Sequence, residues 1–263
     1  MMLSLVAMAS LGGCEGCRKS VPVDALEARP YPSCADGSDT SEPVVLLQGE
    51  LRSGPAMRPQ GVAESYALLE NGCLRILRVH QEWPQGTSDL EIMYDASWLP
   101  MRVWRRTLPR NHPDPLTRAD VRVYDLRNDP TTMHWRKPSG ELELREFRGV
   151  RPMAVVASAR ASLIPWILRE ELGVDEVADR PVLDIRQQWD EIEAVPLFRV
   201  ADRYEPDLGR DVRVHTLFGS QAVYTTEEGE LLGDLAGMRV EGALDTEAPA
   251  AAERYPYDAR VMP

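Results

Sequence analysis

The chain has 263 residues and a formal net charge of −12 at pH 7, with 43% hydrophobic and 27% charged residues. Such a composition excludes a largely disordered protein, and the acidic balance argues against a nucleic-acid partner because phosphate recognition needs a basic surface. No run of about 18 apolar residues occurs, so we expect nothing after the N-terminus to span a bilayer as a helix.

An uncharged, mostly apolar run at residues 3–11 ends in the sequence Leu-Gly-Gly-Cys at 11–14. The run is too short to span a membrane but has the length of a signal-peptide core. The four residues resemble the lipobox of bacterial lipoproteins, in which an aliphatic residue and two small residues precede the cysteine that receives a diacylglycerol. This resemblance implies a signal peptide at 1–13 and a lipid on Cys14. The sequence departs from the pattern in having no Lys or Arg before the run, and an ordinary cleaved signal is the alternative.

A lipid on Cys14 implies a location in the cell envelope, facing the periplasm or the cell surface, with the membrane as a partner through the anchor. An exported location permits disulfide bonds. Of the remaining cysteines, we expect Cys34 to pair with Cys73, because Cys17 lies next to the anchor; three unpaired thiols are the alternative. The Cys14-x-x-Cys17 spacing is half of a zinc site at most, and Arg18 stands where haem attachment needs histidine.

Composition divides the rest of the chain into three parts. Residues 14–42 are polar and rich in Pro, Ser, Asp and Gly, which predicts a flexible, lipidated tether. Residues 241–263 show little periodicity and predict a flexible tail. The segment between them, 43–240, is predicted to be a single β-rich domain.

Strand signals dominate this domain. The strongest is Asn71-Gly72, because both residues tolerate the positive φ of a tight hairpin turn. Further hairpins are predicted across 138–140, 206–209 and Glu228-Gly229. In chain order, the predicted strands cover 62–70, 73–83, 90–94, 98–108, 121–124, 131–137, 141–147, 195–204, 212–218, 222–226 and 230–235.

One helix interrupts the strands, predicted at 162–172 from apolar residues at helical spacing. Ser162 is a suitable N-cap, Pro165 is tolerated in the first turn, and Gly173 can close the C-terminus. The apolar residues that carry the spacing are Leu163, Ile164, Ile167, Leu168 and Leu172.

Hairpins, a mid-chain helix and further hairpins predict an α+β, β-rich fold: a meandering, curved antiparallel sheet with one main helix packed on it. This layout is similar to the periplasmic lipoprotein-carrier proteins, whose curved antiparallel sheet is covered by helices around an apolar cavity. The likeness rests on strand order and the hairpin at Gly229, and it transfers no site residues.

The sequence contains no G-x-S-x-G, H-E-x-x-H, G-x-x-x-x-G-K or G-x-G-x-x-G motif, so it predicts no catalytic residue, metal or cofactor. His80, His112, His134 and His215 are far apart, and His134 and His215 lie in predicted strands with polar outer faces. A lone strand histidine is typical of a surface or structural role. The strand at 212–218 has the clearest alternation, with Val212, Val214, Thr216 and Phe218 on one face.

Acidic residues cluster after the helix, at Asp184, Asp190, Glu191 and Glu193. In principle such carboxylates can pair as acid and base or bind a hard cation. Their spacing matches no known signature of either kind. We therefore expect a solvated acidic face.

Tryptophans are the remaining candidates for binding. Trp98, Trp104 and Trp135 lie on or beside predicted strands, and Trp166 lies on the helix that must pack against the curved sheet. One interpretation is core filling, since aromatic rings bury large areas. The other is an apolar ligand groove between sheet and helix, near Trp135 and Trp166.

The function expected from the sequence is a membrane-anchored envelope lipoprotein with a non-enzymatic binding or structural role, whose partner is an apolar small molecule or an envelope protein. An envelope hydrolase with an unrecognised active site is the alternative. Binding predicts a cavity, whereas an enzyme predicts titratable groups that converge in one cleft.

Overall fold

A computed structural model describes residue 34 and residues 43–53, 61–110, 119–186, 190–217 and 221–240. The predicted signal peptide, Cys14, Cys17, His112 and the predicted tail lie outside these residues, as does the predicted tether apart from Cys34. Within the described part of the chain, no helix is both long enough and apolar enough to cross a membrane.

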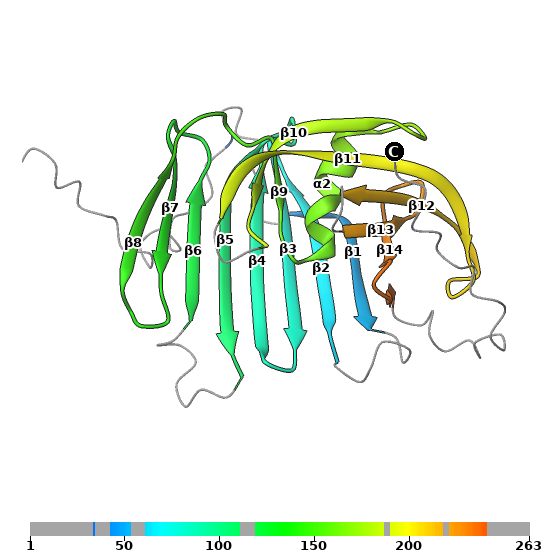
Figure 1. Cartoon of the computed structure of the whole chain (residues 1–263), viewed down its shortest axis with the longest axis horizontal. Coiled ribbons are helices and arrows are strands. Elements are labelled where there is room, and N and C mark those ends of the chain that lie inside the picture. The colour runs from blue at the N-terminus through cyan, green and yellow to red at the C-terminus, as the bar shows by residue number, and fades with distance from the viewer. Residues whose placement is uncertain are drawn as a thin grey trace, which may run out of the picture.

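Fifteen strands of the described residues form one curved sheet, and the predicted fold class is confirmed (Figure 1). Every neighbouring pair is antiparallel except β9 and β10, which run parallel. The order in the sheet is β8-β7-β6-β5-β4-β3-β2-β1-β15-β14-β13-β12-β11-β10-β9. The strands are β1 (Val44–Ser53), β2 (Ala63–Asn71), β3 (Leu74–Trp83), β4 (Gly86–Tyr94), β5 (Pro100–Pro109), β6 (Asp120–Asp125), β7 (Thr131–Arg136), β8 (Leu142–Phe147), β9 (Ala154–Val156), β10 (Val177–Asp184), β11 (Glu191–Glu205), β12 (Arg210–Leu217), β13 (Gln221–Thr225), β14 (Leu231–Asp234) and β15 (Met238–Val240).

The hairpins follow from local sequence. Asn71 ends β2, Gly72 adopts φ +59°, and Asn71 pairs with Leu74 at the start of β3. Burial then alternates along β2, where Glu64, Tyr66 and Leu68 are buried while Ser65 and Ala67 between them are half-buried. The hairpin predicted at Asn71-Gly72 is therefore confirmed.

The sheet folds back on itself. In Figure 1, β1–β8 run side by side in one layer, and the long β11 passes across that layer. Contacts tie the two parts together: Arg105 of β5 donates to the Ile185 carbonyl (2.8 Å), and Arg122 and Tyr124 of β6 donate to Asp190 (2.8 and 2.7 Å). The core therefore lies between two halves of one sheet.

The chain ends of the described domain meet inside the sheet. Strand β1 pairs with β2 on one side and with β15 on the other, where Leu51 lies opposite Val240 and Ser53 opposite Met238. The first and last strands are thus interior neighbours rather than edges.

The helix begins differently from the prediction. A 3₁₀ turn, η2 (Arg160–Leu163), precedes α2 (Ile164–Glu170), and Ser162 caps neither of them. The Ser162 hydroxyl instead bonds the Ala157 amide and the Ala159 carbonyl, which closes the turn before the helix. The expected N-cap role of Ser162 is therefore wrong.

The end of the helix also differs. Glu171 takes the left-handed conformation (φ +46°) directly after α2, so the helix ends at Glu170, three residues before Gly173. Gly173 instead makes a local contact, its amide donating to the Glu176 carboxylate (2.7 Å). A left-handed residue ends a helix whatever its type, although glycine adopts that conformation at least cost.

Candidate functional site

Strand β12 carries apolar residues on both faces. Val212 and Val214 pack with Tyr224 and Leu232 on one side of the sheet, whereas Leu217 joins the main core on the side of α2. Because side chains alternate along a strand, the face that bears Leu217 also bears His215. His215 is 3% exposed. The expectation for His215 was a surface or structural role; its burial toward the helix rules out the surface role.

A pocket of about 520 Å³ lies at this position, between the C-terminal half of α2 and strands β11–β13. We call it the His215 pocket. On the helix side its wall is apolar, with Ile167, Leu168 and Leu172. On the sheet side its wall is polar, with Arg199 of β11, Arg213 and His215 of β12 and Thr225 of β13.

Strand register brings these polar residues together. Arg199 lies directly opposite His215, and Arg213 lies directly opposite Thr225. Residues opposite one another on neighbouring strands have their side chains on the same face. Four residues that are far apart in sequence therefore share one patch.

Three buried polar atoms of this patch have no hydrogen-bond partner among the described residues: Arg199 Nε, His215 Nδ1 and Thr225 Oγ1. The Thr225 side chain belongs to a residue that is 0% exposed. Leaving a buried donor or acceptor unpaired costs about 1–3 kcal/mol. The three residues that carry these atoms line one pocket, which makes the pocket a candidate binding site.

The other nitrogens of the two arginines are paired. Arg199 donates to the Leu172 carbonyl (3.1 Å) and to both oxygens of Asp202 (2.9 and 3.0 Å). Arg213 donates to the carbonyl (3.0 Å) and the carboxylate (2.6 Å) of Glu227. Both guanidinium groups are thus held in fixed positions at the pocket wall.

Burial, followed by the positive charges of Arg199 and Arg213, lowers the pKa of His215 to about 4. The imidazole is therefore neutral at pH 7 and presents one donor and one acceptor nitrogen. The two arginines lower the pKa of His215 more than Asp202 raises it, so the surrounding charges disfavour the protonated ring.

A tight turn closes one end of the pocket. Gly229 has φ +87°, and a Cβ there would lie 2.7 Å from Leu168 Cδ2. Only glycine combines that backbone conformation with such a close approach to the helix. The predicted turn at Glu228-Gly229 therefore has a second role, which is to bring the β13–β14 connection against α2.

The four tryptophans proposed as ligand contacts are not gathered in one groove. Trp166 is 2% exposed within the main core. Trp135 packs at the edge of the same core, with Arg122, Lys137 and Arg145 lying 4.5, 5.1 and 5.1 Å from its ring centroid. Both rings thus fill space or stack against cations.

Trp98 and Trp104 are separated from each other. Trp98 lies against the main core beside Tyr94, with ring centroids 6.2 Å apart. Trp104 belongs to a different cluster, with Val121 and Val123, on the opposite face of the sheet. The expectation that all four tryptophans line one groove is corrected for Trp104, because alternation along β5 turns it away from the helix.

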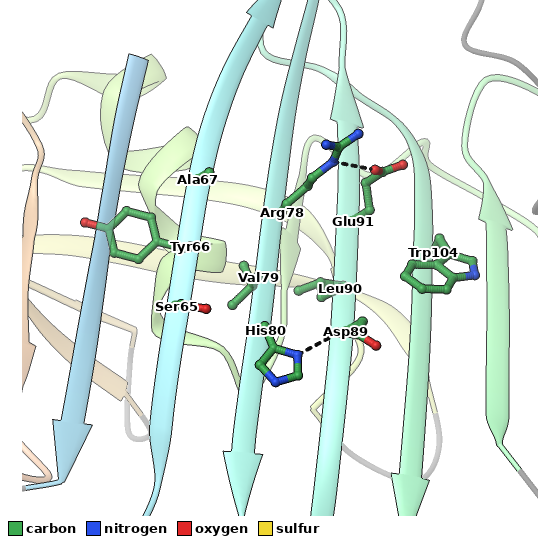
Figure 2. A pocket seen from close by; sticks show the side chains of 10 residues that line it. All are labelled: Ser65, Tyr66, Ala67, Arg78, Val79, His80, Asp89, Leu90, Glu91 and Trp104. Atoms are coloured by element: carbon green, nitrogen blue, oxygen red, sulfur yellow. Dashed lines mark hydrogen bonds and ion pairs between the residues drawn. The ribbon is translucent and has the colours of Figure 1, made fainter. Parts of the chain in front are cut away.

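Figure 2 shows the face that Trp104 shares, across β2–β5, where side chains border a hollow of about 410 Å³. Ion pairs cross the strands there. His80 Nδ1 lies 2.7 Å from Asp89, Arg106 donates to the same carboxylate (2.9 Å), and Arg78 donates to Glu91 (3.0 Å).

Ser65, His80 and Asp89 lie directly opposite one another on three neighbouring strands, which invites comparison with a hydrolytic triad. His80 Nε2, however, lies 3.4 Å from Glu82, so both ring nitrogens face carboxylates. Asp89, chiefly, raises the pKa of His80. With carboxylates beside both ring nitrogens, His80 has no nitrogen free to accept a proton from Ser65. His80 therefore belongs to an ion-pair network.

The acidic cluster after the helix is not a solvated face. Asp184 is buried and bonds Arg186 (3.0 Å), and Asp190 is buried against Arg122 and Tyr124. Only Glu191 and Glu193 of the four are exposed. The expected solvated face is therefore wrong for the two aspartates. Asp184 pairs with the nearby Arg186, and Asp190 pairs with Arg122, 68 residues away in the sequence.

Among the described residues, no group of three or more His, Cys, Asp or Glu side chains is placed to hold a metal.

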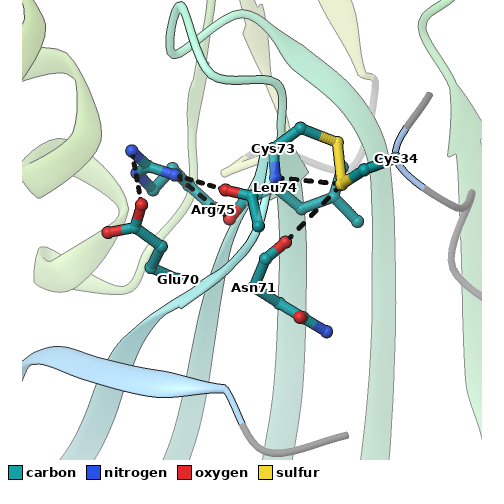
Figure 3. The surroundings of a disulfide bond; sticks show 7 residues. Cys34, Glu70, Asn71, Cys73, Leu74 and Arg75 are labelled. Atoms are coloured by element: carbon teal, nitrogen blue, oxygen red, sulfur yellow. Dashed lines mark hydrogen bonds and ion pairs between the residues drawn. A yellow bond between two sulfur atoms is a disulfide. The ribbon is translucent and has the colours of Figure 1, made fainter. Parts of the chain in front are cut away.

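Cys34 and Cys73 form a disulfide across 39 residues, the pairing preferred from the sequence (Figure 3). Cys73 follows the Asn71-Gly72 turn, and its amide lies 2.9 Å from Cys34 Sγ. Arg75 pairs with Glu70 beside the turn (3.0 Å). The bridge therefore attaches Cys34 to the turn of the first hairpin, which β2 and β3 form in the layer of strands β1–β8.

Comparison with known proteins identifies no family for this chain. No model of a protein family matches the chain, and no curated protein sequence matches it. Among solved structures, it is similar to a β-barrel-like protein of DUF1849, a domain of unknown function, from Brucella abortus, with a TM-score of 0.44, 13% identity, and coverage of 75% of this chain and 96% of that one. It is also similar to a DUF1089 family protein from Pseudomonas aeruginosa, with a TM-score of 0.34, 12% identity, and coverage of 86% and 100%.

Proposed function

We propose that the protein is a lipid-anchored envelope protein whose domain binds a small amphipathic molecule in the His215 pocket and does no chemistry on it. The anchor is supported by the Leu-Gly-Gly-Cys sequence at 11–14. The pocket volume of about 520 Å³ lies within the range of sites for small organic ligands, about 300–1,000 Å³.

One observation carries the binding role: Arg199 Nε, His215 Nδ1 and Thr225 Oγ1 are buried without partners and line one pocket. A ligand that bonds these atoms would relieve a cost to the free protein. The fold could have avoided that cost with apolar residues of similar shape.

The character of the two walls points to an amphipathic ligand rather than the purely apolar one expected from the tryptophans. Ile167, Leu168 and Leu172 offer apolar contact on one side. A pure hydrocarbon would leave the donors and acceptors of the polar wall unpaired, which costs free energy.

Binding is favoured over the alternative of an envelope hydrolase. A nucleophile needs a base within hydrogen-bond reach, and neither described candidate meets this condition. His80 has carboxylates at both ring nitrogens, and no hydrogen bond joins His215 Nδ1 or Thr225 Oγ1 to any described group.

The test uses N-phenyl-1-naphthylamine, an uncharged probe whose fluorescence rises in apolar surroundings. The full chain should bind the probe, and decanol or decanoate should displace it. Leu168→Arg places a charge on the apolar wall and should abolish binding. Leu142→Arg is the control, because Leu142 lies exposed on β8, outside the pocket.

Two results would count against the proposal. One is a folded wild-type protein that gives no fluorescence increase. The other is equal binding by Leu168→Arg and wild type, which would put the probe elsewhere. Circular dichroism of each variant establishes that the domain is folded before binding is compared.

A further inference from the structure

The geometry points to a carboxylate as the polar end of the ligand: we infer that the His215 pocket binds a monocarboxylic amphiphile of the fatty-acid type, with its carboxylate on Arg199, His215 and Thr225. This inference rests on the proposed function and names the ligand class for the same site.

The first support is the balance of donors. Arg199 Nε is a donor in every state of the side chain, Thr225 Oγ1 can donate, and the neutral His215 ring can donate from Nδ1. All three are buried and unpartnered. A carboxylate has two oxygens with about four acceptor positions and no donor. It is therefore able to satisfy all three atoms at once, whereas a hydroxyl satisfies one or two.

The second support is charge. The charged groups that face His215 are Arg199 on β11, Arg213 on its own strand and Asp202 beyond Arg199; Glu171, Glu227 and Glu228 also line the pocket. The acidic members are screened, because the Asp202 and Glu227 side chains are 46% and 78% exposed. The Arg199 side chain, at 11% exposed, is screened less than these carboxylates, so the buried end of the wall favours an anion over a cation.

The third support is the placement of the apolar wall. Arg199 donates to the carbonyl of Leu172, so the cationic wall is attached directly to the segment that carries the apolar one. Leu168, in the last turn of α2, and Leu172, two residues beyond its end, both line the pocket and form an apolar strip. A carboxylate on Arg199 would therefore leave an attached chain to run along this strip.

The experiment compares three probes with the same ten-carbon chain: decanoate, 1-decanol and decyltrimethylammonium, each below its micelle concentration and measured by displacement of N-phenyl-1-naphthylamine. Decanoate should bind at least about tenfold more tightly than decanol, as expected for hydrogen bonds to a charged group. The ammonium probe should bind more weakly than decanol because it meets Arg199 and Arg213.

Thr225→Val isolates one donor while keeping the shape of the side chain. It should weaken decanoate about tenfold without lowering the melting temperature, because the hydroxyl has no partner in the free protein. Thr216→Val is the matched control: it lies on the other face of β12, where its hydroxyl bonds the Leu217 and Gln221 carbonyls (3.2 and 3.2 Å). It should leave decanoate binding unchanged.

A second readout follows the His215 ring by NMR. A carboxylate beside the ring favours its charged form, so decanoate should raise the pKa of His215 from about 4 toward its ordinary value, and decanol should not. If decanol binds as tightly as decanoate, or the histidine signal ignores decanoate, the carboxylate inference is overturned while the proposed function stands. If none of the probes binds, the proposed function itself fails.

Discussion

The carboxylate of Glu64, the second residue of β2, accepts a hydrogen bond from the backbone amide of Ala161 at 2.8 Å, across a separation of 97 residues. It also accepts the amide of Arg160 (3.1 Å) and the side-chain amide of Gln81 (3.0 Å). The first turn of a helix leaves amides without intrahelical partners. Glu64 satisfies two of these at η2, and it is 1% exposed. A sheet residue therefore takes the place of the local cap that Ser162 does not provide.

Glu64→Ala should lower the free energy of unfolding by about 2–4 kcal/mol, because it leaves buried amides unpaired. Urea denaturation measures the change. Glu50→Ala is the control, since Glu50 makes only an exposed ion pair with Arg52 (3.7 Å) and its loss should cost less than about 1 kcal/mol. Equal effects of the two substitutions would contradict the capping role of Glu64.

Asp190→Asn should lower the free energy of unfolding by about 3–5 kcal/mol, the typical cost of removing one partner from a buried ion pair. Asp190 is the residue through which β6 holds the start of β11, because Arg122 and Tyr124 both donate to it. Glu191→Gln, at the exposed neighbouring residue, is the control and should change stability little. Thermal and urea unfolding of both variants decide the matter.

The two described strand histidines with shifted pKa values should titrate on opposite sides of 6.5. The pKa of His80 is raised by Asp89, so its contribution to stability is complete below pH 6.5 and is lost as the pH rises through the folded pKa. The pKa of His215 is lowered to about 4 by burial, so its contribution is present above pH 6.5 and is lost as the pH falls toward 4. NMR titration with His80→Asn and His215→Asn for assignment would show the order; a reversed order would contradict both environments.

Loss of the Cys34–Cys73 bridge should destabilise the domain by about 2–4 kcal/mol, since the bridge closes a loop of moderate length in the unfolded chain. The double variant Cys34→Ser/Cys73→Ser measures this against wild type in urea. Thiol labelling of the unfolded, unreduced protein, read by peptide mass spectrometry, should modify neither cysteine. Modification of both cysteines would rule the bridge out.

Cys14→Ser should abolish incorporation of labelled fatty acid and move the protein out of the membrane fraction. A diacylglycerol carries two chains, and each buried CH₂ contributes about 0.8 kcal/mol, so the wild type should be held where a single chain would be marginal. Unlabelled wild-type protein that stays with the membranes, together with an unchanged variant, would contradict the lipobox interpretation.

The hairpins were predictable because their signals are local. Asn71-Gly72 and Glu228-Gly229 stand at turns whose backbone conformation favours those residues, and the strands on either side alternate. The helix was predictable in its place but not in its ends. Its start depends on Glu64, which no local pattern connects to Ala161, and its end depends on Glu171 in a conformation that sequence assigns more readily to Gly173.

The His215 pocket was not predictable from the same signals. Alternation in β12 places Val212 and Val214 on one face of the strand. Both faces of the sheet carry buried apolar residues there, so alternation alone does not show which face lies toward the helix. The polar wall arises only when the registers of β11, β12 and β13 are known. Tryptophan positions drew attention to the core because ring size alone cannot separate a packed side chain from a ligand contact.

The pairing of β1 with β15 constrains the order in which this domain can be completed. A chain that emerges N-terminus first exposes β1 with one edge unpaired until Met238–Val240 have followed. An open edge of this kind is a template for pairing with other chains, and contacts between distant parts of a sequence form slowly. Any truncation before Met238 would therefore remove β15 from the middle of the sheet, whereas loss of an edge strand would only narrow the sheet. The incomplete protein would then aggregate through β1, a strand that does not line the His215 pocket.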